Sequence, residues 1–215
     1  MYPKQENYQL ARQLAIEALV KSNLEERAAQ AGGDYEPGPD GQSTIGLMYL
    51  GHELFLCFPE GKIEDKNKQG VPLREEIFIL HYLQKATGVP LTQRWASFTE
   101  IPGGAFYSPV FLQRCRSPLA KFFGSDPELL KSAVEGMKGE SLHLGDVGFK
   151  IRAFPFVPLA LVLWRGDEEF PAEANLLFDA SIPEYLPVED IVVLAETVVW
   201  KLIKKGERLK AKGPR

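Results

Sequence analysis

An unbroken apolar run at residues 159–164 constrains the fold more than any other feature of the chain. A second, shorter run at residues 174–178 follows it after a charged break. Apolar runs of this length without polar alternation are typical of strands that are buried on both faces. The sequence therefore predicts a central strand that contains Leu161, Leu163 and Trp164 and is packed under the C-terminal helix.

The other patterns place strands and helices in separate stretches of the chain. Residues 44–50 and 53–58 are typical of a hairpin that turns at Gly51-His52, whereas residues 188–205 carry an apolar stripe at helical spacing. Strand pairs that are segregated from helices, without βαβ alternation, favour an α+β fold. We expect a mainly antiparallel sheet covered by helices.

The domain organisation follows from what the sequence lacks. It shows no internal repeat and no obvious linker, and 215 residues can bury a sizeable core, so we expect a single α+β domain over residues 1–215. Helical spacing predicts an N-terminal helix at about residues 6–30. Residues 204–215 hold six basic residues and one acid, and we expect them to form a frayed basic tail.

Composition narrows the classes of partner and compartment. A net charge of -4 gives no reason to expect nucleic acid, and no apolar run approaches the roughly 20 residues that a membrane span needs. The polar N-terminus lacks the apolar core of a signal peptide, so we expect a cytoplasmic protein. The two cysteines, Cys57 and Cys115, cannot build a disulfide framework, and one chain with two cysteines is not expected to hold an iron–sulfur cluster.

An acidic segment is the first candidate site. Eight acidic residues and no Lys or Arg lie between Asp167 and Asp190. Carboxylates bind Mg²⁺ or Ca²⁺ and can act as acid and base, so Asp167, Glu169 and Asp179 would form a site if their two strands were neighbours. No recognised ligand spacing is present, and we expect no tightly bound metal ion. The alternative is a set of solvated loop acids, in which Glu189 and Asp190 stabilise a helix N-terminus.

A glycine-containing loop is the second candidate site. A glycine pair allows a ligand to approach the backbone, and a helix expected to begin at Ser108-Pro109 would offer unpaired N–H groups to an anion. The candidate ligand-binding residues are Arg94, Gly103, Gly104, Tyr107, Ser108 and Arg114. The alternative is an ordinary capped loop, since neither of the glycine-rich phosphate-binding motifs occurs.

Several blocks of the sequence resemble an uncharacterised prokaryotic family that is known as a domain of unknown function. The blocks are HYLQKATG, RWASFTEIPGGAFYSPVFLQRC, SPLAKFFG and PLALVLWRGDEEFPAEANLLFDASIPEYLPVED. The resemblance implies an origin in anaerobic bacteria or archaea, where such domains are sometimes fused to iron–sulfur modules. It implies no activity.

These observations leave three hypotheses for function. The first is an accessory protein in anaerobic metabolism that binds a small anionic ligand or a protein partner. The second is a metal-dependent enzyme that uses the acidic segment, and the third is a structural subunit of a redox assembly. The sequence identifies no cofactor and no oligomeric state.

Overall fold

The central strand predicted from the apolar run is confirmed in the computed structural model, in which residues 5–212 are described. β8 (Val157–Trp164) lies between β7 (Val147–Phe154) and β9 (Glu173–Asp179) in an antiparallel sheet with the strand order β5-β9-β8-β7-β6. Leu161 and Leu163 are fully buried, as expected. Trp164 ends the strand and is 41% exposed, so burial on both faces stops one residue before the end of the apolar run.

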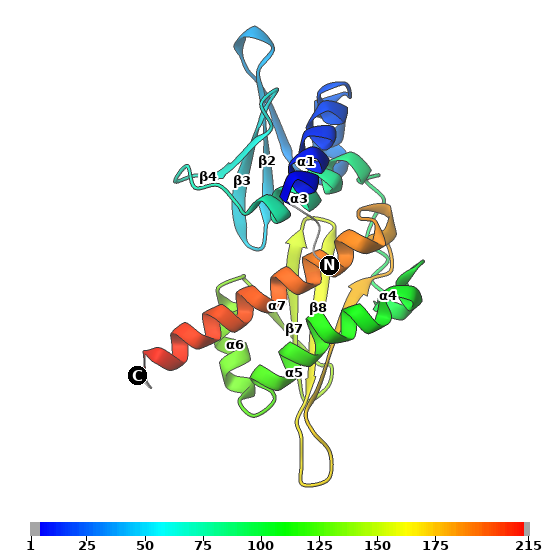
Figure 1. Ribbon diagram of the computed structural model, residues 1–215, viewed down its shortest axis with the longest axis vertical. Coiled ribbons are helices and arrows are strands. Elements are labelled where there is room, and N and C mark those ends of the chain that lie inside the picture. The colour runs from blue at the N-terminus through cyan, green and yellow to red at the C-terminus, as the bar shows by residue number, and fades with distance from the viewer. Residues whose placement is uncertain (1–4, 213–215) are drawn as a thin grey trace.

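Helices cover this sheet and contact one another across it. The further elements of this half, in chain order, are β5 (Trp95–Ser97), η2 (Phe98–Glu100), α4 (Gly104–Phe111), η3 (Leu112–Arg116), α5 (Ser117–Phe123), α6 (Pro127–Glu135), β6 (Glu140–Leu142), η4 (Ile182–Glu184) and α7 (Val188–Ala211). The long helix α7 crosses the sheet and contacts α4, α5 and α6 (Figure 1). Its apolar stripe is buried, which confirms the helical pattern predicted for this part of the chain.

The N-terminal half carries a second antiparallel sheet, with the strand order β1-β2-β3-β4. Its elements are α1 (Gln5–Val20), α2 (Leu24–Ala31), β1 (Asp34–Pro37), η1 (Pro39–Gly41), β2 (Ser43–Tyr49), β3 (His52–Phe58), β4 (Lys62–Asp65) and α3 (Leu73–Lys85). The α+β class is therefore confirmed, but the strands form two sheets where the sequence suggested one. Helix α3 contacts α1, α2 and α7 and so joins the two halves.

The hairpin between β2 and β3 turns at Leu50-Gly51, one residue earlier than predicted. Both turn residues have positive φ, 48° at Leu50 and 82° at Gly51, a pattern that matches a type I′ turn. The Leu50 N–H donates to the Ala153 carbonyl at 3.0 Å, at the end of β7. A Cβ on Gly51 would lie 3.2 Å from the Met137 backbone, so the hairpin tip packs closely against the segment after α6.

Two helix boundaries differ from the sequence prediction. The N-terminal helix predicted over residues 6–30 is two helices, because the Asn23 side chain accepts a hydrogen bond from the Glu26 N–H and caps α2. The predicted frayed tail is largely helical, since α7 continues to Ala211; residues 213–215 lie outside the described residues. These last turns pack against α5 at Gly206, which is buried next to Phe122 and Phe123.

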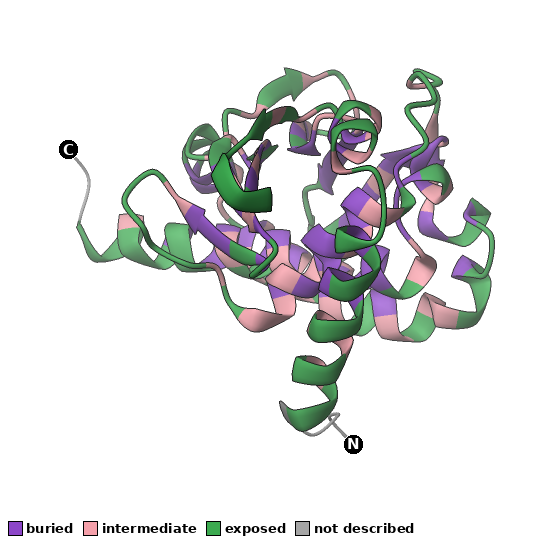
Figure 2. Cartoon of the chain, turned by 90° about the horizontal axis from the view of Figure 1, so that it is seen from above, coloured by how far each residue is buried: buried purple, intermediate pink, exposed green. Residues whose placement is uncertain are grey.

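One hydrophobic core runs through both halves. Its buried residues form a single cluster that includes side chains of both sheets, such as Ile45 and Leu161. The first turns of α1 and the last turns of α7 are largely exposed and project from the body of the molecule (Figure 2). Within residues 5–212, every helix is too short or too polar to span a lipid bilayer.

Candidate functional site

The space beside the glycine pair, where the sequence predicted that a ligand could approach the backbone, is filled by other segments of the chain. Helix α4 begins at Gly104, not at Ser108-Pro109 as predicted, and Pro109 lies inside it. A Cβ on Gly104 would lie 1.8 Å from the Phe98 carbonyl oxygen, and one on Gly103 would lie 3.3 Å from the Val188 side chain. Both glycines are therefore explained by close packing against neighbouring segments.

The other candidates in this region contact acidic partners. The Tyr107 hydroxyl donates to Glu189 at 2.7 Å, and Arg114 pairs with Glu196 at 3.8 Å. Glu189 and Glu196 lie seven residues apart on α7, so Tyr107 and Arg114 contact that helix about two turns, or about 10 Å, apart.

The two remaining candidates, Arg94 and Ser108, do not contact α7 through a hydrogen bond or ion pair within the described residues. Arg94 pairs with Glu100 at 3.8 Å and is mostly exposed, and Ser108 lies half-buried within α4. The structure thus brings Gly103, Gly104, Tyr107 and Ser108 together at the start of one helix.

The acidic segment is spread along β9. Its two strands β8 and β9 are neighbours, as the metal-site hypothesis requires. However, Asp167 lies in the exposed loop before β9, and Asp179 is the last residue of that seven-residue strand. Glu169 lies in the same loop as Asp167, so these two acids are a strand length away from Asp179.

The carboxylates at the two ends of β9 each accept hydrogen bonds from nearby backbone. Asp167 accepts from the Glu169 and Phe170 N–H groups of its own loop. Asp179 is buried and accepts from Thr92, Gln93 and Ser181, through backbone and hydroxyl donors at 2.7–3.0 Å.

These contacts decide the charge of Asp179. Burial opposes its ionisation, but the hydrogen bonds from Ser181 and Thr92 outweigh burial, so the pKa of the Asp179 carboxyl lies below its usual value. Within the described range 5–212, no group of three or more His, Cys, Asp or Glu side chains could hold a metal ion.

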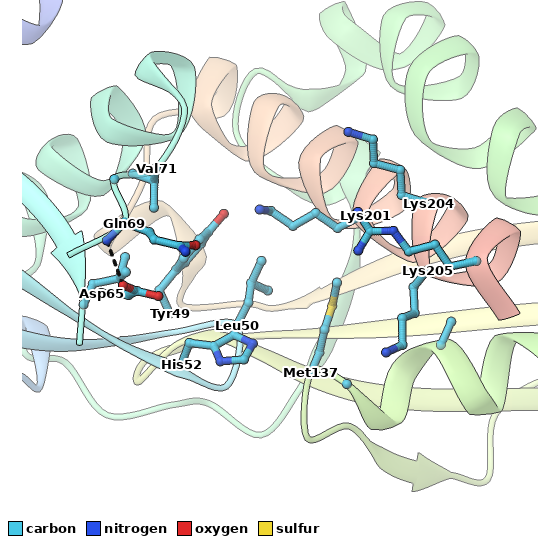
Figure 3. A pocket seen from close by; sticks show the side chains of 15 residues that line it. Tyr49, Leu50, His52, Asp65, Gln69, Val71, Met137, Lys201, Lys204 and Lys205 are labelled. Atoms are coloured by element: carbon cyan, nitrogen blue, oxygen red, sulfur yellow. Dashed lines mark hydrogen bonds between the residues drawn. The ribbon is translucent and has the colours of Figure 1, made fainter. Parts of the chain in front are cut away.

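A basic pocket lies where the two halves of the molecule meet. It has a volume of about 470 Å³ and opens between the β2–β3 hairpin, the segment after β4, and helices α6 and α7 (Figure 3). The residues that line it are Tyr49, Leu50, His52, Leu54, Asp65, Gln69, Gly70, Val71, Ala133, Gly136, Met137, Lys201, Lys204, Lys205 and Arg208. A volume of this size suits a small organic molecule.

One cation of this pocket belongs to a buried network. Lys201 of α7 pairs with Glu75 at 3.0 Å, and the Tyr49 hydroxyl donates to the other Glu75 oxygen at 2.7 Å. Glu75 lies in the first turn of α3, where the helix dipole favours a negative charge. Burial raises the pKa of Tyr49 well above its usual value, and the neighbouring Glu75 carboxylate raises it further. This network links β2, α3 and α7 at the edge of the pocket.

The other three cations of the pocket differ from Lys201, which is paired with Glu75. Within residues 5–212, Lys204, Lys205 and Arg208 form no ion pair, although all three line the pocket. Among the described residues of the lining, Asp65 is the one acid, against four Lys and Arg side chains. The pocket therefore carries a net positive charge that its own lining does not neutralise.

The chain belongs to the DUF3786 family. The model of this family, described as a domain of unknown function, matches residues 23–201, which is most of the chain. No curated protein and no solved structure matches the chain. The resemblance to a domain of unknown function seen in the sequence is thereby confirmed.

The family match includes the walls of the pocket on β2, β3 and α6 and ends at Lys201. Lys204, Lys205 and Arg208 follow the last matched residue. Sequence analysis assigned these three residues to a frayed tail and so missed the pocket. The sequence did contain a signal for a shared surface. Counted from Lys201, the three residues stand at i+3, i+4 and i+7, and residues at these positions share one face of a helix.

Proposed function

We propose that this protein is an accessory protein that binds a small anionic ligand in the basic pocket. The observation that supports it is the convergence of four cations from one face of α7 on a single pocket. Three of them, Lys204, Lys205 and Arg208, form no ion pair within the described residues. Like charges gathered on one helix face repel one another, and a bound anion would relieve this repulsion.

The rest of the pocket fits a small ligand of this kind. Leu50, Leu54 and Val71 supply apolar surface, while His52 and Gln69 supply polar groups at its edge. Apolar walls with a few placed polar groups are the usual composition of a small-molecule site. The anionic ligand expected from the sequence is therefore placed by this proposal at α7, away from the start of α4.

We extend the proposal to the setting of the protein. The resemblance of its sequence to domains of anaerobic bacteria and archaea supports a role in the cytoplasm of an anaerobic prokaryote. Their fusion to iron–sulfur modules in some cases supports a redox system as the surrounding pathway.

Binding of simple anions tests the proposal. Citrate and tripolyphosphate, each at about 1–10 mM in low salt, are expected to raise the melting temperature, because a ligand that binds only the folded state stabilises it. The double variant Lys204→Ala/Arg208→Ala is expected to weaken binding about tenfold or more, since the loss of two charge-assisted contacts removes well over 1.4 kcal/mol.

The double variant Lys21→Ala/Lys85→Ala is the matched control for net charge, because both lysines are exposed and lie outside the pocket. This variant is expected to keep the affinity of the wild type. Binding that is equally strong in Lys204→Ala/Arg208→Ala and in the control would place the anion elsewhere, and the absence of binding to both anions would overturn the proposal.

A further inference from the structure

The two walls of the basic pocket differ in charge. On α7, the cations Lys201, Lys204, Lys205 and Arg208 follow one helix face over about 10 Å. Opposite them, Asp65 ends β4 and Gln69 lies in the segment between β4 and α3 (Figure 3).

Apolar surface separates these walls. Leu50 and Met137 lie between the basic and the acidic side in Figure 3, and Leu54 and Ala133 also line the pocket. The pocket thus has a cationic end, an apolar middle and an end with a carboxylate. A ligand that matches this order has negative charges at one end and hydrogen-bond donors at the other.

Asp65 is held in place as an acceptor. Its Oδ1 atom accepts from the Asn67 and Gln69 N–H groups at 2.8 and 2.9 Å, whereas Oδ2 is reached only by the Asn67 side chain at 3.4 Å. The Gln69 N–H lowers the pKa of the Asp65 carboxyl, so this side chain is ionised at neutral pH. Its second oxygen is free to accept a hydrogen bond from a ligand.

A compact inorganic anion fits this pocket poorly. It would reach only neighbouring cations of the 10 Å row, and the charge of Asp65 would repel it. A chain of phosphates could follow the cations along about two turns of α7, and Arg208 can bind phosphate oxygens in pairs. A ring that carries an amine could rest on the apolar middle and donate to Asp65.

We infer that the ligand is an organic polyphosphate with an amine-bearing ring, the class to which the amino-purine and amino-pyrimidine nucleoside triphosphates belong. Its phosphates lie along α7, and its amine donates to Asp65. This inference rests on the proposed function, because it assigns a chemical class to the anion of the same pocket.

Calorimetry without divalent metal provides the test, with ATP, inosine triphosphate and tripolyphosphate as probes. ATP is expected to bind about tenfold more tightly than inosine triphosphate, which has a carbonyl in place of the amine, because that carbonyl cannot donate to the charged Asp65 acceptor. This comparison needs no variant. Lys204→Ala/Arg208→Ala is expected to weaken the binding of ATP and tripolyphosphate alike, and Lys21→Ala/Lys85→Ala is expected to change neither.

Asp65→Asn gives the sharper result, since Asn retains the acceptor oxygen that closes the local turn. The variant is expected to weaken ATP about fivefold through loss of the charged acceptor, and to strengthen tripolyphosphate about threefold through loss of repulsion. A purely structural role of Asp65 would change both affinities in the same direction.

The outcomes separate the two proposals. If citrate and tripolyphosphate bind in a Lys204- and Arg208-dependent manner but ATP binds no more tightly than inosine triphosphate, the nucleotide class is wrong and the anion site remains. Equal changes of both affinities in Asp65→Asn would also overturn the assigned class. If no anion depends on Lys204 and Arg208, the anion site itself is wrong.

Discussion

The acidic segment that ends in the first turn of α7 and the basic face near the end of α7 are close in sequence, but the fold uses their charges differently. In the acidic segment, Asp179, Glu189 and Asp190 accept hydrogen bonds from Thr92, Tyr107 and His81, which belong to other elements. On the basic face, three of four cations form no ion pair within the described residues.

This difference indicates which charged residues are available to a ligand. A carboxylate that accepts short hydrogen bonds from other segments through both of its oxygens, as Asp179 does, fixes the position of those segments, and a ligand would have to displace their donors. A cation that lines a pocket without a partner can bind an anion at no such loss. Charge along the sequence did not separate the two cases, because both stretches are rich in one sign of charge: eight acids and no Lys or Arg at residues 167–190, and six basic residues and one acid at residues 204–215.

Asp179→Ala is expected to cause the largest loss of stability. It leaves the donors of Thr92, Gln93 and Ser181 without an acceptor, and we expect a loss of about 3 kcal/mol in the free energy of unfolding, measured with urea. Because the pKa of Asp179 is lowered, its stabilisation is complete above about pH 4 and is lost as the pH falls further. Asp179→Asn keeps one acceptor and is the milder control, and an Ala variant as stable as wild type would contradict the role assigned to this carboxylate.

Tyr49→Phe tests the network at the edge of the pocket. Removing the hydroxyl that donates to Glu75 is expected to lower the free energy of unfolding by about 1.5–3 kcal/mol at pH 7. The pKa of Tyr49 is raised by folding, whereas an unfolded tyrosine ionises near pH 10, so wild-type stability falls as the pH rises above about 10.

The variant lacks this contribution, and its stability is expected to fall less steeply between about pH 10 and 11.5. Urea titrations across that range measure both slopes, with Tyr8→Phe on α1 as the control. Parallel slopes in wild type and Tyr49→Phe would show that Tyr49 does not contribute to the alkaline loss.

Asp167→Asn is expected to change the free energy of unfolding by less than about 0.5 kcal/mol. Asp167 is exposed, its contacts lie within its own loop, and Asn can accept the same backbone hydrogen bonds. Thermal unfolding measures the change. A loss as large as that of Asp179→Ala would mean that the loop acids support the fold and that the two ends of β9 are alike.

Lys204→Ala and Lys205→Ala are expected to have the smallest effect on stability, within a few tenths of a kcal/mol. Removing a like charge from one helix face relieves repulsion of about 0.2–0.5 kcal/mol, and within the described residues neither lysine forms an ion pair that would be lost. Thermal melts without ligand measure this effect. A loss of more than about 1 kcal/mol would indicate a structural role of these lysines.

Much of the framework could be predicted because it depends on local pattern. The apolar run that contains Leu161 and Leu163 predicted a central strand, and the stripe of α7 predicted a buried helix; both are confirmed. The glycine pair at Gly104 indicated that something approaches the backbone closely, but the sequence did not show that the neighbour is the chain itself. The contact of Gly104 with the Phe98 carbonyl belongs to a turn whose backbone path the sequence does not show.

The sequence by itself determined the α+β class, the strand and helix patterns, and the presence of an acidic and a basic cluster. Only the tertiary structure decided which cluster lines a pocket. Lys204, Lys205 and Arg208 share one helix face because α7 continues past Lys205, where Gly206 packs against Phe122 and Phe123. They line a pocket because the tip of the β2–β3 hairpin lies opposite that face, where the Leu50 N–H is hydrogen-bonded to the Ala153 carbonyl. Both contacts link segments far apart in the chain, and local propensity and spacing contain no information about such pairings.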